Sequence, residues 1–540
     1  MNAFIHREAR TRVRWIRWSR LLLCYLFIAS CSGDDAEPQP PAPQSPQGLT
    51  PEFLLSEQLT LNPTGYAPLS ARLDLRADQP IRVSLRIQGK DGDEDTIQQD
   101  FPETGQDLSI PIHGLYAGFE NSVRITFYDA SGNLLANKDY QLQTAPLLAD
   151  LPQISIEVAD RGRMAPGFTL VSYFGHAGQV LPQRPFIFDA RGEIRWYLDY
   201  KNHPELSGLF YDDGMERLAN GNLYFGSGGG NFGGIPTNKI YEIDLFGTIV
   251  DSWAMPGYGF HHEVHEKPNG NFLVTVNELG AATVEDQVIE IDRATKQIIR
   301  RWDLKQSLEA GRDVWTTDTE DWFHANAVLF DPTDNSIVVS GRTQGVVKLS
   351  EANEPVWILA PHKNWGTSGA GADLTQFLLQ PLDASGTAIS DPAVLDGDIP
   401  HPDFDWNWYQ HAPALLPDGT LLMFDNGDSR NYGTSPFYSR AVAYEISAEQ
   451  LTVRQDWEYG KDRGLETFSR IVSDVDYLAS RDHVLFSPGA VNFQGDLYGK
   501  SVEVDRASGE VVFEATIRPP MAFFDIITLH RTERMPLYPD

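Results

Sequence analysis

The sequence has few cysteines and far fewer basic than acidic residues. Its 540 residues include two Cys, and 43 Lys and Arg stand against 75 Asp and Glu, for a formal net charge of −32. So few cysteines exclude a small disulfide-stapled scaffold. A surface this acidic repels phosphate backbones and so disfavours a nucleic-acid partner. An anionic substrate would therefore need a local positive site.

The amino terminus also lacks an apolar run long enough to span a bilayer. Six Arg between Arg7 and Arg20 precede the apolar residues 21–28, and Cys31 follows shortly after. This run falls well short of the ~20 residues that a transmembrane helix needs. The pattern favours an export signal over residues 1–30, and a transmembrane anchor is the less favoured alternative.

The end of this run, Ile28-Ala29-Ser30-Cys31, resembles the lipobox of bacterial lipoproteins. The resemblance implies cleavage before Cys31, lipid on Cys31, and a disordered tether over residues 31–50, a stretch rich in Pro, Gln, Asp and Ser. We expect an exported lipoprotein, attached through Cys31 to the periplasmic face of a bacterial membrane. The outer membrane is favoured because Ser32, and not a retention Asp, follows Cys31.

Such processing changes the composition of the functional chain. Cys24 leaves with the leader and Cys31 carries lipid, so no thiol remains for a disulfide, a metal or a nucleophile. The leader also removes six Arg and one Glu, which takes the net charge from −32 to −37. The mature protein is more acidic than its precursor.

Residues 51–152 form short segments in which apolar and polar side chains alternate. The segments 71–76, 81–87 and 123–127 have a period of two, and residues 129–133 have the composition of a turn. About a hundred residues of this pattern predict an immunoglobulin-like β-sandwich. No polar side chains converge in the pattern, so we expect this domain to pack against the next one or to orient it.

Residues 153–540 repeat one pattern six times: a strand ends at an acidic or polar turn, and a second strand closes on an aromatic residue. The turn positions lie 48 to 58 residues apart, except for one interval of 97. Four-stranded units at this period predict a six-bladed β-propeller with one large insertion; the repeats of a parallel β-helix, the alternative, are shorter. The turn residues are Asp189, Asp244, Asp292, Ser350, Ser447 and Asp505, and the closing aromatics are Trp196, Trp253, Trp302, Trp357, Trp457 and Phe513.

Two histidines hold equivalent positions in this repeat. His262 lies six residues before Pro268-Asn269-Gly270, and His411 lies six residues before Pro417-Asp418-Gly419. His324 also opens an alternating apolar strand, although the turn that follows it is longer. Since the innermost strand of every propeller blade faces the central channel, we expect the three imidazoles to meet at one mouth of that channel.

Arg342 and Asn326 complete the predicted constellation. Arg342 stands eighteen residues after His324, near the start of the same blade's third strand. It supplies the cation that an anion pocket in so acidic a chain needs. Each His taken alone could merely cap a strand, but three at matched positions favour a site. Arg430 is either a second anion contact or a turn residue, and the turn is favoured.

Two other interpretations stay open. Three converging imidazoles could bind a divalent ion, as in a metal-dependent hydrolase or lyase. Arg342 and the lack of an evident carboxylate ligand beside the histidines disfavour that hypothesis. A propeller that only binds a partner is the other alternative, and it would make the three matched histidines coincidental.

Further segments are specific when they are taken together. They are FHHEV (260–264) with PNGN (268–271), DWFHAN (321–326) with RTQGVVK (342–348), QH (410–411) with FDNGD (424–428), WEYGK (457–461) and ERMPLYP (533–539). With these segments the chain resembles the bacterial arylsulfate sulfotransferase family over nearly all of its mature length. The members of that family are exported six-bladed propellers with an amino-terminal β-sandwich.

The resemblance implies transfer of a sulfuryl group from a phenolic sulfate ester to a phenolic acceptor. It implies a ping-pong mechanism through a sulfohistidine intermediate, without a nucleotide sulfate donor, a metal or an organic cofactor. The family's nucleophile maps on His411, and its other site residues map on His262, His324, Asn326 and Arg342. His324 or His262 would protonate the leaving phenolate. The oligomeric state stays open, a homodimer included.

Two features limit what the resemblance carries. His261 directly precedes His262, so the assignment could slip by one residue, although the six-residue count favours His262. Aromatic residues beside the mapped positions could stack on aryl rings or simply pack in the core. They are Trp322, Phe323, Trp406, Trp408 and Tyr409.

Overall fold

The computed structural model describes residues 50–174, 184–206, 215–226, 238–314, 318–520 and 528–539. The predicted export signal and lipidated Cys31 lie outside the described residues, as does the predicted tether except for Thr50. The described part of the chain is all-β, and its α-helices, α1 (Leu304–Ser307), α2 (Pro392–Leu395) and α3 (Arg430–Gly433), have four residues each. None of its helices is long and apolar enough to cross a membrane.

The first sheet lies in the region predicted to be a β-sandwich. Its order is β1-β2-β4-β5, and β3 pairs with β2 outside this path. In β2 the side chains of Ala71, Leu73 and Leu75 are buried and those between them are not, so one face of the strand carries the core. The bounds are β1 (Leu54–Leu61), β2 (Ser70–Ile87), β3 (Ile97–His113), β4 (Glu120–Asp129) and β5 (Leu134–Gln143).

Six further sheets follow in the described residues, and the pairing within them is almost entirely antiparallel. The first consists of β10 (Glu216–Arg217), β11 (Leu223–Gly226), β12 (Lys239–Ile243) and β13 (Ile249–Ala254). The second consists of β14 (Tyr258–Glu266), β15 (Phe272–Glu278), β16 (Gln287–Ile291) and β17 (Ile298–Asp303). The third consists of β18 (Ala325–Asp331), β19 (Ser336–Gly341), β20 (Gly345–Leu349) and β21 (Pro355–Leu359). Each therefore has four strands in chain order.

The next two sheets carry additional strands. One joins β23 (His411–Leu415), β24 (Leu421–Asp425), β25 (Arg440–Ser447) and β26 (Thr452–Tyr459), and the short β22 (Gln380–Leu382) pairs parallel to β26. The other joins β27 (Asp474–Leu478), β28 (His483–Ser487), β30 (Asp496–Asp505) and β31 (Val511–Arg518), with β29 (Val491–Phe493) beside β30 and β6 (Gln153–Ala159) beside β31.

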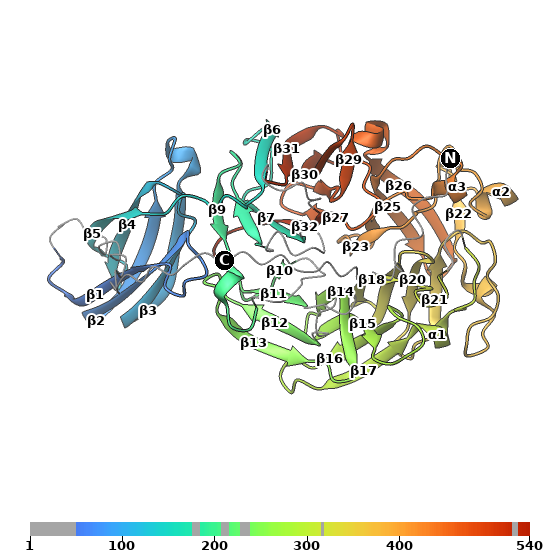
Figure 1. Ribbon diagram of the computed structural model, residues 1–540, viewed down its shortest axis with the longest axis horizontal. Coiled ribbons are helices and arrows are strands. Elements are labelled where there is room, and N and C mark those ends of the chain that lie inside the picture. The colour runs from blue at the N-terminus through green and yellow to red at the C-terminus, as the bar shows by residue number, and fades with distance from the viewer. Residues whose placement is uncertain are drawn as a thin grey trace, which may run out of the picture. The chain divides into compact units, whose positions relative to one another are not determined.

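The last sheet joins the two ends of this region. Strand β32 (Thr528–Met535) pairs with β7 (Phe168–Phe174), which is followed by β8 (Phe186–Phe188) and β9 (Ile194–Tyr197). The first strands of successive sheets contact one another, β14 with β18, β18 with β23, β23 with β27, and β27 with β32 (Figure 1). Residues that are equivalent in the repeat are thereby brought to neighbouring places.

Tryptophans connect four of the six sheets in the described residues to the turn of the following sheet. The indole Nε1 of Trp196 donates to the carbonyl of Leu245 at 2.7 Å, and Trp253 donates to Arg293 at 2.9 Å. Trp302 donates to Ser350 at 2.9 Å, and Trp457 makes the same bond to the turn of the following sheet. An aromatic residue that also donates a hydrogen bond fills space and fixes orientation together. Four of the six closing aromatics predicted from the repeat are therefore intersheet links.

The predicted insertion lies between β21 and β23. It contains the 3₁₀ segment η3 (Leu374–Phe377), β22 and α2, and it packs a fully buried Trp406 whose Nε1 donates to the carbonyl of Val394 at 2.8 Å. The remaining 3₁₀ segments are η1 (Asp93–Asp95), η2 (Tyr200–Asn202) and η4 (Lys461–Glu466). The insertion ends in residues 405–410, which lead directly into β23 and His411.

The first sheet is held against the repeated sheets by buried polar contacts. Arg195 of β9, which is completely buried, donates to the carbonyl of Gly114 at 2.7 and 2.9 Å and pairs with Asp189 at 2.9 Å. The hydroxyl of Tyr538 accepts from the backbone N–H of His113 at 2.7 Å. The carboxyl terminus thus contacts the amino-terminal sheet.

Candidate active site

The three predicted histidines occupy irregular positions at the start of first strands. His262 lies within β14, His324 directly precedes β18, and His411 is the first residue of β23. His262 and His324 have left-handed backbones, with φ of 64° and 55°, and the pairing with the second strand shifts register at all three places. Bulges re-aim side chains, and such φ values persist only where the surroundings hold them. This geometry lets side chains of three sheets meet.

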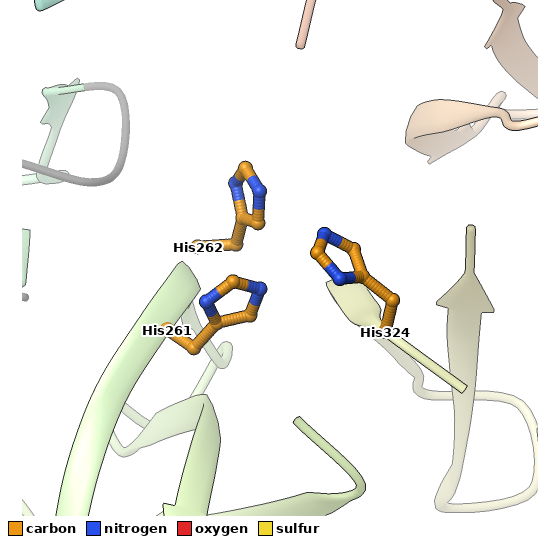
Figure 2. Close-up of side chains that lie close together, drawn as sticks. All are labelled: His261, His262 and His324. Carbon is orange, nitrogen blue, oxygen red and sulfur yellow. The ribbon is translucent and has the colours of Figure 1, made fainter. Parts of the chain in front are cut away.

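His262 lies at the centre of the imidazole cluster. Its ring centroid is 5.8 Å from that of His324, 5.7 Å from that of His411 and 4.5 Å from that of His261. Figure 2 shows the rings of His261 and His262 on one side and the ring of His324 facing them from another part of the chain. The structure brings the predicted histidines together and adds His261, which the sequence analysis treated as a register ambiguity.

His530 is a further member of the cluster that the sequence analysis missed. It lies in β32 where the pairing with β7 shifts register between Leu529 and Arg531, and its ring centroid is 5.7 Å from that of His262. The bulge is the same device that presents His262. No Asn-Gly or Asp-Gly turn follows β32 before the chain ends, so the six-residue count had no reference point there.

Hydrogen bonds fix the tautomer of His411. Its Nδ1 lies 2.7 Å from Oδ1 of Asn426 and 3.0 Å from the carbonyl of Tyr409. The amide nitrogen of Asn426 donates to the carbonyls of Ser469 and Val472, both at 2.9 Å, which orients Oδ1 toward the imidazole. Both partners of Nδ1 are acceptors, so Nδ1 carries the hydrogen and Nε2 keeps the lone pair.

Burial keeps two imidazoles of the cluster neutral. Burial lowers the pKa of His411 to about 3, and the charges of Arg342 and His324 act in the same direction, against the hydrogen bond that His411 donates to Asn426. Burial also holds the pKa of His262 well below its usual range, with His261 and His530 contributing. His411 is therefore a neutral base with an available Nε2 at physiological pH.

Two carboxylates hold the opposite side of the cluster. Nδ1 of His324 lies 2.6 Å from Oδ2 of Asp321 and 2.5 Å from Oε2 of Glu285, and the same Glu285 oxygen lies 3.0 Å from Nε2 of His261. Burial alone would raise the pKa of Glu285, but His261 and His324 outweigh it and hold that pKa well below its usual range. An ionised Glu285 thus bridges two imidazoles.

This finding corrects the argument that no carboxylate lies beside the histidines. Glu285 precedes β16 and has a left-handed backbone with φ of 56°, and Asp321 stands three residues before His324. Asp321 was visible in the DWFHAN segment, but its pairing with His324 depends on the turn between them. Glu285 carried no sequence signal, because its partner His324 is far along the chain. Nε2 of His324 has no hydrogen-bond partner among the described residues.

Arg342 and Asn326 lie beside this cluster in different roles. The guanidinium of Arg342 is a quarter exposed, 3.9 Å from Asp321 and 5.7 Å from the ring centroid of Tyr409. Its backbone N–H donates to the carbonyl of His324 at 3.0 Å, which fixes the two residues together. The amide nitrogen of Asn326 donates to the carbonyl of Gln410 at 2.8 Å, so this residue anchors the segment that leads into His411.

The aromatic residues flanking the site divide into two groups. Trp322 and Phe323 are buried, and a Cβ on Gly341 would lie 2.5 Å from the ring of Phe323, so this ring packs directly on the backbone. Trp408 and Tyr409, in contrast, line a cavity of about 40 Å³ beside Arg342. Ordinary packing explains the first pair and the buried Trp406, whereas the second pair adjoins the site.

The interpretation of Arg430 as a turn residue is incomplete, and it is not an anion contact. Its side chain is buried and pairs with Asp405 and Asp425, each at 2.8 Å. Oδ1 of Asp425 accepts from the backbone N–H of Trp408 at 2.9 Å. Buried charges are tolerated when they are paired in this way. Arg430 therefore supports the segment before His411.

Two groups of side chains could hold a divalent ion. The ligand atoms of His261, His262 and His324 lie within 4.8 Å of one another, and so do those of Glu285, Asp321 and His324. Imidazole and carboxylate ligands suit several divalent metals. Glu285 also lies within hydrogen-bond distance of His261 and His324. The same atoms can therefore form hydrogen bonds with one another instead of binding a metal ion.

The site contains the groups that acid–base catalysis of the transfer of a charged group requires. They are the neutral imidazole of His411, the neighbouring guanidinium of Arg342 and the imidazole of His324, which contacts two carboxylates. The family model described as Arylsulfotransferase (ASST) matches residues 155–522, and the model described as Arylsulfotransferase Ig-like domain matches residues 58–145. The chain therefore belongs to the arylsulfotransferase family and begins its described part with an Ig-like domain. The resemblance found in the sequence is confirmed, and the protein is a sulfotransferase enzyme.

Individual relatives agree with this assignment. The chain is 28% identical to the arylsulfate sulfotransferase AssT of Escherichia coli O6:H1 (strain CFT073), covering 85% of this chain and 89% of that protein. It is 27% identical to the arylsulfate sulfotransferase AssT of Lelliottia amnigena, covering 87% and 92%. A solved auxiliary nutrient binding protein from Bacteroides ovatus ATCC 8483 is 10% identical with a TM-score of 0.31, covering 83% of this chain and 94% of that chain, which is too weak to support an argument.

The neutrality of His411 predicts how stability depends on pH. Its pKa is about 3 in the folded protein, against the ordinary value of 6.5. The unfolded chain therefore binds a proton between these values that the folded chain does not. The free energy of unfolding should lose about 1.4 kcal/mol per pH unit through His411 as the pH falls from 6 to 4.

Urea unfolding of the protein and of His411→Asn at pH 6, 5 and 4 measures this contribution. Buried carboxylates with raised pKa values, such as Glu533, act in the opposite direction but are common to both proteins. The variant should therefore show a shallower loss of stability at low pH. Parallel curves for the two proteins would contradict the assignment of a neutral, buried His411.

Proposed function

We propose that the protein transfers a sulfuryl group from a phenolic sulfate ester to a phenolic acceptor, with His411 as the nucleophile. One observation carries the proposal: His411 is buried, neutral and held through Nδ1, which leaves the lone pair of Nε2 for attack beside Arg342. The names of the two relatives give the substrate class, an aryl sulfate.

Two half-reactions balance the exchange. Nε2 of His411 attacks sulfur, the bond from sulfur to the aryl oxygen breaks, and the phenolate leaves with a proton from the protein. A second phenol then gives up its proton and attacks the sulfur of the sulfohistidine, and the N–S bond breaks. Donor and acceptor use one pocket in turn, so ping-pong kinetics follow.

Arg342 is suited to the charge that moves in both steps. A sulfuryl group, like a phosphoryl group, passes through a loose transition state whose charge spreads over its outer oxygens. A fixed guanidinium and nearby N–H donors stabilise such charge without rearranging. Arg342 has one distant ionic contact, to Asp321 at 3.9 Å, and its Nε lacks a hydrogen-bond partner among the described residues. Its donors are available to a sulfuryl oxygen.

His324 is the better candidate for the general acid and base. Asp321 and Glu285 both contact its Nδ1, which orients the ring, and its Nε2 is left to exchange a proton with a substrate oxygen. His262 lies among imidazoles, and its pKa is held down by burial and by their charges. We therefore assign proton transfer to His324. We assign to His262, which lies between the other imidazoles, the placement of the substrate.

A six-bladed β-propeller is the architecture that best accounts for the repeated sheets. Six sheets occur in chain order among the described residues, and the first strands of successive sheets contact one another from β14 to β32. Strand β32 faces β10 through the ion pair of Arg531 with Glu216, which supports closure of a ring. We propose a domain order of signal 1–30, tether 31–50, sandwich 51–152 and propeller 153–540.

The central test is a transfer assay with 4-nitrophenyl sulfate and phenol. We expect release of nitrophenol that depends on phenol, with no added nucleotide or metal, and a sulfuryl adduct on His411 in mass spectra of donor-treated enzyme. His411→Ala should lose at least ~1,000-fold in rate because the covalent route is gone.

Several results would sink this proposal. Nitrophenol release that is indifferent to phenol, or that survives in His411→Ala, contradicts it. A rate that needs an added divalent ion, is abolished by a chelator and disappears in His262→Ala would instead favour the metal-dependent hydrolase. His401→Ala is a matched control, because that histidine lies away from the cluster and pairs with Phe404 in the insertion.

The role of Glu285 can be separated from mere packing by the choice of leaving group. Glu285→Gln keeps the shape but removes the carboxylate charge that faces Nδ1 of His324, the proposed proton donor. We expect kcat with phenyl sulfate to fall by ~100-fold, and kcat with 4-nitrophenyl sulfate to fall by ~10-fold or less, because nitrophenolate needs no protonation.

Glu320→Gln, a substitution of an exposed neighbour, is the control and should behave as the unchanged protein. Equal losses with both donors would show that Glu285 only orients its neighbours. Unchanged rates with both donors in Glu285→Gln would instead point to His262 as the acid.

We also propose that the protein is lipidated on Cys31 and held at the periplasmic face of the outer membrane. The support is the Ile28-Ala29-Ser30-Cys31 segment and the short apolar run before it. In a Gram-negative host, the Cys31→Ser variant should incorporate no labelled palmitate and should be lost from the membrane fraction. The Cys24→Ser control should still incorporate the label and stay in the membrane fraction. Retention of label in Cys31→Ser would refute the proposal.

A further inference from the structure

A small cavity lies between the turn after β19 and the segment that leads into His411. It measures about 40 Å³, and among its lining residues are Arg312, Arg342, Gln344, Trp408, Tyr409 and Tyr432. A buried water needs roughly 10–15 Å³ of such space, so the cavity accepts a group of a few heavy atoms and not a whole aromatic ring. We call it the Arg312 pocket.

Arg312 is a buried charge without a carboxylate partner among the described residues. It is 3% exposed, and its donors go to the carbonyls of Lys363, Pro361 and Gln344 and to the side-chain oxygen of Gln344, at 3.0 to 3.2 Å. Its guanidinium also stacks 4.0 Å from the ring centroid of Trp365. Burial lowers the pKa of Arg312 to about 9. Buried cations are ordinarily paired, so this one lacks an anion.

Arg342, the other cation that lines the pocket, connects it to the proposed active site. Arg312 donates to Gln344, which stands two residues beyond Arg342 in the same turn. Tyr409, whose ring faces Arg342 at 5.7 Å, provides the carbonyl that accepts from Nδ1 of His411. The pocket and the proposed nucleophile therefore share the same two chain segments.

Aromatic rings and an unused donor complete the lining. Trp408 and Tyr432 meet edge to face with centroids 5.2 Å apart. Nε1 of Trp408 is buried and has no hydrogen-bond partner among the described residues, and the same holds for Nε of Arg342. The guanidinium of Arg312, an indole N–H and aromatic edges suit a planar anion attached to an aryl ring, and Arg342 lies at the side toward His411, where it is left for the sulfuryl group.

We propose that the Arg312 pocket binds an acidic ring substituent, a carboxylate or sulfonate, of the phenolic substrate whose oxygen reaches His411. This inference rests on the proposed function and narrows its substrate class to phenols that carry a second acidic group. The sulfuryl group itself stays with Arg342 and His411, and the ring lies along Tyr409 and Trp408.

The first experiment needs no turnover. Binding of benzoate and of its neutral isostere benzamide to the intact protein is measured by calorimetry or by tryptophan fluorescence. We expect benzoate to bind ~10-fold or more tightly than benzamide, since a charge-assisted hydrogen bond is worth about 1.5–3 kcal/mol. Equal affinities would overturn the proposal, and this arm does not depend on any variant.

The second experiment compares acceptors. With 4-nitrophenyl sulfate as donor, 3-hydroxybenzoate is compared with phenol, because the two hydroxyl groups differ little in acidity. We expect a higher kcat/KM for 3-hydroxybenzoate. In Arg312→Gln that preference should fall ~10-fold or more, whereas Arg312→Lys, which keeps the charge, should retain most of it.

Lys363→Gln is the matched control, because it removes a half-exposed cation beside the pocket that pairs with Asp398. Its acceptor preference should stay as in the unchanged protein. A loss in Arg312→Gln that is equal for both acceptors would show a structural role only and would overturn the proposal. Benzoate preference without any transfer to either acceptor would refute the proposed function while leaving the anion pocket standing.

Discussion

The hydrogen bond from a buried indole to the turn of the following sheet is the contact on which the rest of the structure depends. It recurs at Trp196, Trp253, Trp302 and Trp457, and each time the acceptor is a backbone carbonyl beside the polar turn of the next repeat. Because the same atom pairs repeat, adjacent sheets meet at a constant offset. Bulges at equivalent places in different first strands then fall close together, and the bond of Trp302 joins the sheet of His262 to the sheet that His324 precedes.

The cluster combines two opposite uses of burial. His411 is buried against neutral acceptors and a nearby guanidinium, so it stays unprotonated. His324 is equally buried, but its Nδ1 contacts the carboxylates of Glu285 and Asp321. One small volume thus contains two buried imidazoles with different hydrogen-bond partners, neutral acceptors for His411 and carboxylates for His324. The net charge of the chain, −32, repels other anions but does not determine the contacts of these two imidazoles.

Much of this site could be predicted from the sequence, since repeat positions translate into spatial positions. The six-residue count found His262 and His411, and the segment around His324 found the third imidazole. His530 escaped because no turn follows β32, and Glu285 escaped because its pairing with His324 joins two sheets. The ion pairs of Arg430 escaped because Asp405 belongs to the insertion, which has no counterpart in the other repeats. A contact leaves a periodic trace in the sequence when it recurs in successive repeats, as the tryptophan-to-turn bonds do, and leaves none when it occurs once.

The pairing of β32 with β7 has a consequence for the order in which the molecule becomes complete. Strand β7 is made early and β32 is among the last residues of the chain, yet they belong to one sheet and β32 is its first strand. His530 reaches the ring of His262 only when that strand is in place. A chain that is still being synthesised can build most of its sheets, but it cannot contain the assembled cluster. The five imidazoles are therefore together only in a chain in which β32 has been synthesised and has paired with β7.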